Sequence, residues 1–200
     1  MRFVPALALL VTLVAGCAAA PVASTSSSSV PNPSPSPAPT STSTAAPSPS
    51  LTPQGFIPKK IGEQGGLNCQ TEASCGLKFV VERIETNPAC GQYGTKADAG
   101  SKTVVLHVSM STGELSQDQS FYAAGIFNPF SMKGISPDGF VHDAKPGSCL
   151  DFTGAMPNQI LPNSKYSGHV EVVLPESVTS IASASTGTGS KSRGWVWPIS

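Results

Sequence analysis

The stretch Lys102-Thr103-Val104-Val105-Leu106-His107-Val108-Ser109-Met110-Ser111-Thr112 decides the fold class of this chain. Apolar residues occupy every second position, namely Val104, Leu106, Val108 and Met110. A period of two is typical of a β-strand that buries one face and turns the other toward water or a partner. We therefore predict a strand over residues 102–112 with these four side chains in the core and Thr103, Val105 and His107 facing outward.

Four further segments carry strand patterns. Tyr166–Leu174 alternates again, with Tyr166, Gly168, Val170, Val172 and Leu174 on the predicted core face and Ser167, His169, Glu171 and Val173 on the other. Leu77–Thr86 is rich in β-branched residues, Phe140–Ala144 follows the turn sequence at 136–139, and Arg193–Ile199 is the terminal strand. A polar loop is expected between Ser183 and Ser192.

No ten-residue helical periodicity appears after Phe56, and the aromatic segment 121–130 is too interrupted by glycine and proline to predict an element. Short strands, turns and no intervening helices favour an all-β antiparallel sandwich with Greek-key connections. The 145 residues from Phe56 to Ser200 (200 − 55) are enough for one core. We expect one folded domain over residues 56–200.

The order of several short motifs resembles a known family. They are Phe79-Val80-Val81-Glu82-Arg83-Ile84, the 102–108 strand, Pro137-Asp138-Gly139, and Leu161-Pro162-Asn163-Ser164 leading to Gly168–Pro175. Together they resemble the immunoglobulin-like domain of bacterial, especially actinobacterial, lipoproteins, a family related to a secreted mycobacterial immunoprotective antigen. The resemblance covers roughly Leu77 to Ile199. It implies an immunoglobulin-like β-sandwich and supplies no catalytic residues.

The N-terminus has the layout of a secretory signal. Arg2 precedes an apolar run from Phe3 to Val14, and small residues follow. The run is shorter than the roughly 20 residues that span a bilayer. Leu13-Val14-Ala15-Gly16-Cys17 resembles the lipobox of bacterial lipoproteins, which implies a signal peptide over 1–16 and lipidation of Cys17. Two or three acyl chains would hold the protein at the outer face of the cell membrane. The alternative is ordinary cleavage between Ala18 and Ala20, with loss of Cys17.

Residues 17–55 are predicted to be a disordered tether. The segment from Ala18 to Gly55 has no charged residue and is dominated by Ser, Thr, Pro and Ala. Such a composition buries too little apolar surface to offset its ordering entropy. Extended polyproline II would give it a reach of at most about 100 Å. Ser/Thr/Pro tracts also occur as O-glycosylated stalks, so both modified and unmodified forms stay open.

The charge balance argues against nucleic acid as a partner. The chain has 12 Lys plus Arg and 12 Asp plus Glu, and removal of Arg2 with the signal leaves 12 − 1 = 11 against 12. A nucleic-acid surface needs a clear basic excess.

Cys69, Cys75, Cys90 and Cys149 remain beyond the anchor, and an even number in an exported domain indicates disulfides. Four cysteines allow three connectivities. We favour Cys69–Cys75, a local loop, together with Cys90–Cys149. A zinc site is the alternative, but the chain has no Cys-x-x-Cys pair.

The catalytic motifs that can be recognised by spacing are absent: no Gly-x-Ser-x-Gly, phosphate-binding loop, dinucleotide fingerprint or His-Glu-x-x-His occurs. A Ser/His/Asp triad from distant positions stays open, since its members need not be close in the chain. His107, His142 and His169 could also join Asp138, Asp143 or Glu171 in one site. His107, His169 and Glu171 would converge on a divalent ion if their strands were neighbours and their faces exposed. Solvated strand residues are the simpler interpretation, so we expect no resident metal or cofactor.

Two aromatic groups are candidates for recognition. Trp195 and Trp197 share one strand face and serve either as a platform or as core. Phe121, Tyr122, Phe127 and Phe130 are the preferred candidates for an exposed binding loop. We expect a non-catalytic lipoprotein that displays a binding module for an envelope protein or cell-wall component. The alternatives are an envelope hydrolase and an extracytoplasmic carrier of a small ligand or metal.

Overall fold

The computed structural model describes residues 50–69, 71, 74–184 and 192–199. The signal peptide predicted over 1–16, Cys17, and the predicted tether as far as residue 49 lie outside the described residues. So do residues 185–191 of the loop predicted between Ser183 and Ser192.

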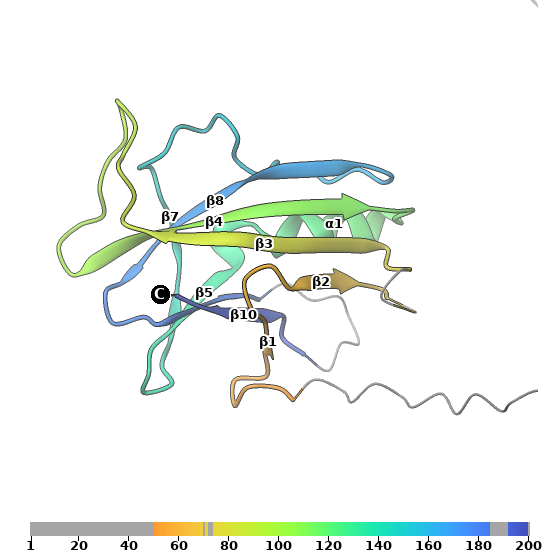
Figure 1. Ribbon diagram of the computed structural model, residues 1–200, viewed down its shortest axis with the longest axis horizontal. Coiled ribbons are helices and arrows are strands. Elements are labelled where there is room, and N and C mark those ends of the chain that lie inside the picture. Colours follow the sequence, from red (N-terminus) through yellow and green to blue (C-terminus); the bar gives the residue numbers. More distant parts are fainter. Residues whose placement is uncertain (1–49, 70, 72–73, 185–191, 200) are drawn as a thin grey trace, which may run out of the picture. The chain divides into compact units, whose positions relative to one another are not determined.

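Ten strands form two five-stranded sheets. Sheet A has the order β1 (Ile57–Pro58), β10 (Trp195–Pro198), β9 (Ser180–Ser183), β5 (Met132–Ile135) and β6 (Val141–Asp143). Sheet B has the order β2 (Gln64–Leu67), β3 (Leu77–Thr86), β4 (Ser101–Thr112), β8 (Lys165–Pro175) and β7 (Lys145–Pro146). Every neighbouring pair is antiparallel except β1 and β10. Figure 1 shows β3, β4 and β8 side by side above β1, β5 and β10. The structure confirms the predicted all-β sandwich.

The core lies between the sheets and is centred on β4. Val104, Leu106, Val108 and Met110 are all buried, as the alternation predicts. They meet Val170, Val172 and Leu174 of β8, which are buried on the predicted face of their own strand. β4 pairs with β3 on one side and β8 on the other. The strand that decides the fold is therefore central in its sheet.

Both tryptophans belong to this core, so they do not form a recognition platform. Trp195 is 4% exposed and Trp197 is fully buried. The Phe79 ring packs edge-on against Trp195, with centroids 4.8 Å apart, and against Phe127 at 5.1 Å. Gly65, opposite Phe79 in the β2–β3 pair, makes room for this ring, because a Cβ there would lie 2.2 Å from the ring.

The outer face of β4 is only partly solvent-facing, which corrects the prediction for Thr103 and Val105. Both are buried, whereas His107 is half-buried. The segment after β3 lies beside this face, since Cys90 and Ala97 line one hollow together with Thr103. Asn87 continues the β3–β4 pairing: Thr103 N donates to Asn87 Oδ1 at 2.9 Å, and Asn87 N donates to Thr103 O at 2.8 Å. Alternation identifies the two faces of a strand but does not show that a loop covers the second one.

A helix, α1 (Gln117–Ile126), and a short 3₁₀ turn, η1 (Pro129–Ser131), connect β4 in sheet B to β5 in sheet A. The prediction of no helix after Phe56 is therefore wrong. Ser116 caps α1: its Oγ accepts from Gln119 N, and Gln119 Oε1 accepts from Ser116 N. Ala123 and Ile126 are buried in the core. None of the helices in the described segments is long and apolar enough to cross a membrane.

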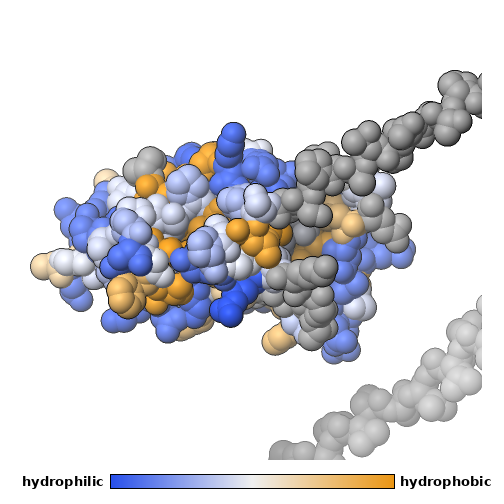
Figure 2. Space-filling view, turned by 90° about the horizontal axis from the view of Figure 1, so that it is seen from below, coloured by the Kyte–Doolittle hydropathy of each residue, from blue (hydrophilic) through white to orange (hydrophobic). Residues whose placement is uncertain are grey.

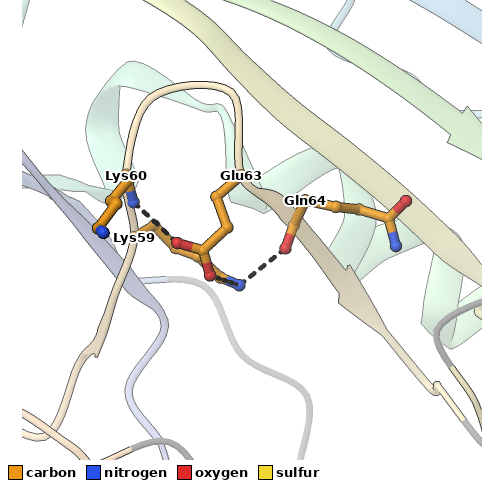
Figure 3. Close-up of polar contacts among 4 residues, drawn as sticks. All are labelled: Lys59, Lys60, Glu63 and Gln64. Atoms are coloured by element: carbon orange, nitrogen blue, oxygen red, sulfur yellow. Dashed lines mark hydrogen bonds and ion pairs between the residues drawn. The ribbon is translucent and has the colours of Figure 1, made fainter.

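The turn from β1 to β2 carries the chain from sheet A to sheet B and is held by Glu63 (Figure 3). Lys59 Nζ lies 2.7 Å from Glu63 Oε1 and also donates to Gln64 O at 2.7 Å. Lys60 N donates to the second carboxylate oxygen at 3.0 Å. The hydrogen bond from Lys59 and the one from the Lys60 backbone lower the pKa of Glu63.

The outer face of sheet A carries a second, smaller apolar cluster of Phe56, Ile135, Ala182 and Val196. Figure 2 views this side and shows apolar side chains in small groups separated by hydrophilic ones. Residues 52–55 form a hydrogen-bonded turn beside it, since Gly55 N donates to Thr52 O and Arg193 N donates to Gly55 O, each at 2.8 Å. The folded unit thus includes residues that the sequence analysis assigned to the tether.

Two disulfides join Cys69 to Cys75 and Cys90 to Cys149. This is the pairing favoured from the sequence. The first closes a local loop beside β2, with a sequence separation of 6, and the second joins segments 59 residues apart.

Candidate functional site

The four aromatic residues proposed as one binding loop lie on two elements and have different surroundings. Phe121 is 78% exposed on α1, and Tyr122 is half-buried beside it, with ring centroids 6.0 Å apart. Phe127, at the end of α1, is 5% exposed and packs against Phe79, so its assignment to an exposed loop is wrong. Phe130, in η1, is 75% exposed.

The η1 turn holds Phe130 in an outward position. Asn128 Oδ1 accepts from Phe130 N at 3.0 Å, and Pro129 occupies the first position of the turn. The Ser131 hydroxyl donates to the carbonyl oxygens of Gly125 and Asn128. The turn is therefore tied to the end of α1, and the exposed ring has a fixed base.

Phe130 lines one wall of a groove of about 390 Å³ next to the β7 edge of sheet B. The segment after Cys149, in which Phe152 is 88% exposed, forms a second wall. The lining residues are Phe127, Asn128, Pro129, Phe130, Pro146, Gly147, Leu150, Asp151, Phe152, Ala155, Met156, Asn158, His169, Val170 and Glu171. We call this the aromatic groove. A concave, mostly apolar site of this size with a few polar groups is typical of ligand binding.

Backbone hydrogen bonds fix the second wall onto the edge of β8. Met156 N donates to His169 O at 2.9 Å, and His169 N donates to Gly154 O at 2.8 Å. Gly168 allows this close approach, because a Cβ there would lie 2.7 Å from Gly154 O. This wall of the groove is consequently attached to β8 of sheet B.

The Glu171 side chain is buried and binds the backbone of the same wall. Its predicted place on an exposed face is therefore wrong. The residue is 9% exposed. Its Oε1 accepts from Cys149 N at 2.6 Å, and its Oε2 accepts from Leu150 N at 2.9 Å. Gly147 leaves space for this carboxylate, since a Cβ there would lie 2.3 Å from Glu171 Oε1. The Cys90–Cys149 disulfide and the Glu171 carboxylate thus hold the start of the groove wall together.

The histidines proposed for a divalent ion do come together, but Glu171 does not join them. His107 and His169 are directly paired across β4 and β8, with ring centroids 6.3 Å apart. His107 Nε2 lies 3.0 Å from Arg83 Nη2 and 3.5 Å from Glu85 Oε1. Burial and then the Arg83 charge lower the pKa of His107. Within the described part of the chain, no group of three His, Cys, Asp or Glu side chains could hold a metal ion.

A serine and a histidine meet elsewhere, in the β5–β6 hairpin. The Ser136 hydroxyl lies 2.7 Å from His142 Nε2. Ser136 is 6% exposed, and neither residue lines the aromatic groove. Asp143 pairs with Lys133, which lowers the pKa of the Asp143 carboxyl through the side-chain hydrogen bond. Asp138 Oδ1 is 3.4 Å from Phe140 N. Neither aspartate therefore completes a triad with this pair.

Sequence reasoning missed most of the groove. Phe152, Leu150 and Met156 carry no periodic signal, because they lie in an irregular segment interrupted by Gly154 and Pro157. The available signal was Phe152 itself, a large aromatic residue beside Asp151 in a segment whose sequence does not predict a strand.

The fold and the site define a disulfide-braced β-sandwich with an aromatic groove at one sheet edge. Comparison with protein-family models and with curated proteins finds no match. Two solved structures are similar. One is a secreted protein from Mycobacterium tuberculosis, MPT63, with 12% identity and a TM-score of 0.43 over 72% of this chain and 98% of that chain. The other is an uncharacterized beta-sandwich protein from Clostridium difficile 630, with 11% identity and a TM-score of 0.42 over 76% of this chain and 100% of that chain.

Proposed function

We propose that this chain is a lipid-anchored binding module on the outer face of the cell membrane, and that the aromatic groove is its binding site. The anchor is supported by the sequence Leu13-Val14-Ala15-Gly16-Cys17. Two disulfides in the folded unit support an oxidising compartment. The partner in this proposal is an envelope protein or cell-wall component.

The observation that carries the binding role is the pair of exposed rings, Phe130 and Phe152, which come from two separate segments and line one groove. Two exposed phenylalanine rings leave apolar surface in contact with water, and the free energy of burying that surface becomes available when a partner covers it. The walls are nevertheless fixed, one by the η1 hydrogen bonds and the other by the β8 edge, Glu171 and a disulfide. A preformed apolar site loses less entropy on binding than a flexible one.

An envelope hydrolase is the second candidate, and the contact between Ser136 and His142 is the observation that favours it. We rank it lower because the Ser136 side chain is buried and its nearby carboxylates are engaged with Lys133 and with the hairpin backbone. The proposed role is therefore binding without catalysis.

The experiment places a photoreactive benzoylphenylalanine at position 152 or, as a matched control, at position 121 of the full chain in living cells. Both positions hold exposed phenylalanines, but only Phe152 lines the groove. Irradiation should give a discrete adduct from position 152 and none from position 121. The same adduct should disappear in a Cys17→Ser chain, which loses its anchor. Equal adducts from both positions, or an unchanged adduct in the Cys17→Ser chain, would contradict the proposal.

A further inference from the structure

The aromatic groove carries an unbalanced negative charge. Its charged lining residues are Asp151 and Glu171, and no lysine or arginine lines it. Glu171 is buried and bound to two backbone N–H groups, whereas Asp151 is exposed and follows Leu150, one of the two donors to Glu171. Among the described residues, neither carboxylate forms an ion pair. Two carboxylates thus lie in a groove lining that has no lysine or arginine and in which His169 is the remaining titratable residue.

The same groove presents aromatic faces. Phe130 and Phe152 are exposed lining residues, and Phe127, Met156 and Val170 add apolar surface to the lining. The face of an aromatic ring is electron-rich and attracts a cation that lies over it. The apolar lining favours the hydrocarbon part of a ligand. The carboxylates and the ring faces both favour a positively charged group on that ligand.

We propose that the aromatic groove binds a small organic cation, an ammonium group joined to an aromatic or aliphatic body. This inference rests on the proposed function and adds the class of ligand. The groove volume of about 390 Å³ lies in the range of small-ligand sites. An anionic ligand with the same body would meet Asp151 and Glu171 as like charges and bind more weakly.

The test uses three probes that share one body and differ in charge: 4-phenylbutylammonium, 4-phenylbutanol and 4-phenylbutyrate. The full-length chain is labelled with ¹³C at its methionine methyl groups and studied by NMR in a neutral detergent. Met156 lines the groove, and Met132 is fully buried in the core and serves as an internal reference. Dissociation constants come from the shift of the Met156 methyl signal.

We expect the Met156 signal to move with the ammonium probe while the Met132 signal stays in place. The ammonium probe should bind about fivefold more tightly than the alcohol at low salt, the upper end of an exposed ion pair, and the carboxylate probe should bind most weakly. Added salt should reduce the preference for the cation.

Two matched pairs of variants separate charge from apolar contact. Asp151→Asn should reduce the preference for the cation, because Glu171 and the ring faces remain, whereas Asp98→Asn, at an exposed aspartate outside the groove, should leave it unchanged. Phe152→Ala should weaken all three probes, and Phe121→Ala should weaken none. For each probe, comparison of variants in the same detergent solution cancels partition of that probe into micelles, and the affinities of different probes are compared at their measured free concentrations.

Equal affinity for the three probes, or a preference for the cation that Asp151→Asn leaves undiminished, would overturn the ligand class while leaving the groove as a binding site. A Met156 signal unmoved by every probe would overturn the ligand class as well. The adduct from position 152 in cells then decides separately whether the groove binds a partner at all.

Discussion

Removal of the Cys90–Cys149 disulfide should destabilise this protein about twice as much as removal of the Cys69–Cys75 disulfide. The perturbation is a paired replacement, Cys90→Ala with Cys149→Ala, and the matched control is Cys69→Ala with Cys75→Ala. The larger bridge has a sequence separation of 59, and the smaller one has a separation of 6. Loop-closure entropy gives about 4 kcal/mol for the first and about 2 kcal/mol for the second.

Urea unfolding followed by tryptophan fluorescence measures both losses. The only two tryptophans of the chain, Trp195 and Trp197, are buried in the core, so their emission reports exposure of that core. With a urea dependence of about 2 kcal/mol per molar, the midpoint should fall by about 2 M for the large bridge and about 1 M for the small one. An equal fall in both variants, or a larger fall from the small bridge, would refute the entropy argument.

Three further predictions concern single side chains. Glu63→Gln should lower the free energy of unfolding by about 0.5 kcal/mol at pH 7 through loss of the contact with Lys59. Because the folded state lowers the pKa of Glu63, this stabilisation is fully present above the ordinary value of 4.5 and is lost as the pH falls through the folded pKa. The difference in urea unfolding between the two proteins should therefore shrink as the pH is lowered below 4.5, and a difference that grows would contradict this. Phe79→Ala should cost about 3–5 kcal/mol in the same assay, since it opens a cavity in the core, and a loss below about 1 kcal/mol would argue against the aromatic cluster. Ser136→Ala should cost about 1 kcal/mol through loss of the bond to His142, and a fluorophosphonate probe should leave the wild-type chain unlabelled; labelling at Ser136 would instead favour the hydrolase.

The long strands could be predicted from the sequence because their burial follows a simple period. β4 and β8 each bury one face between the sheets, so apolar residues recur at every second position along most of each strand. Leu77–Thr86 matches β3 in both its bounds. The short strands β5 and β9 escaped prediction, because four residues are too few to establish a period.

The helix α1 was missed for a different reason. Its buried residues are only Ala123 and Ile126, while Phe121 points outward, so no apolar stripe is visible in the sequence. The informative signal was at its start, where Ser116 and Gln119 have the spacing of a capping box.

The candidate site could be predicted only in part. Phe130 lies on the groove as an exposed aromatic residue, in agreement with the sequence interpretation, but Phe127 is core. Glu171 is buried because the segment at Cys149, which is held by the Cys90–Cys149 disulfide, packs against it and donates a hydrogen bond to its carboxylate. Strand alternation describes a residue's own sheet and contains no information on a covering segment from elsewhere in the chain.

The most direct test of the central claim, an exported, lipid-anchored and disulfide-braced module, is the intact mass of the mature protein extracted from membranes and treated with a thiol-alkylating reagent. The account predicts a polypeptide that begins at Cys17, carries the mass of attached acyl chains, and is not alkylated at Cys69, Cys75, Cys90 or Cys149. A lipid-free chain recovered from the cytosol with all four of these thiols alkylated would contradict it.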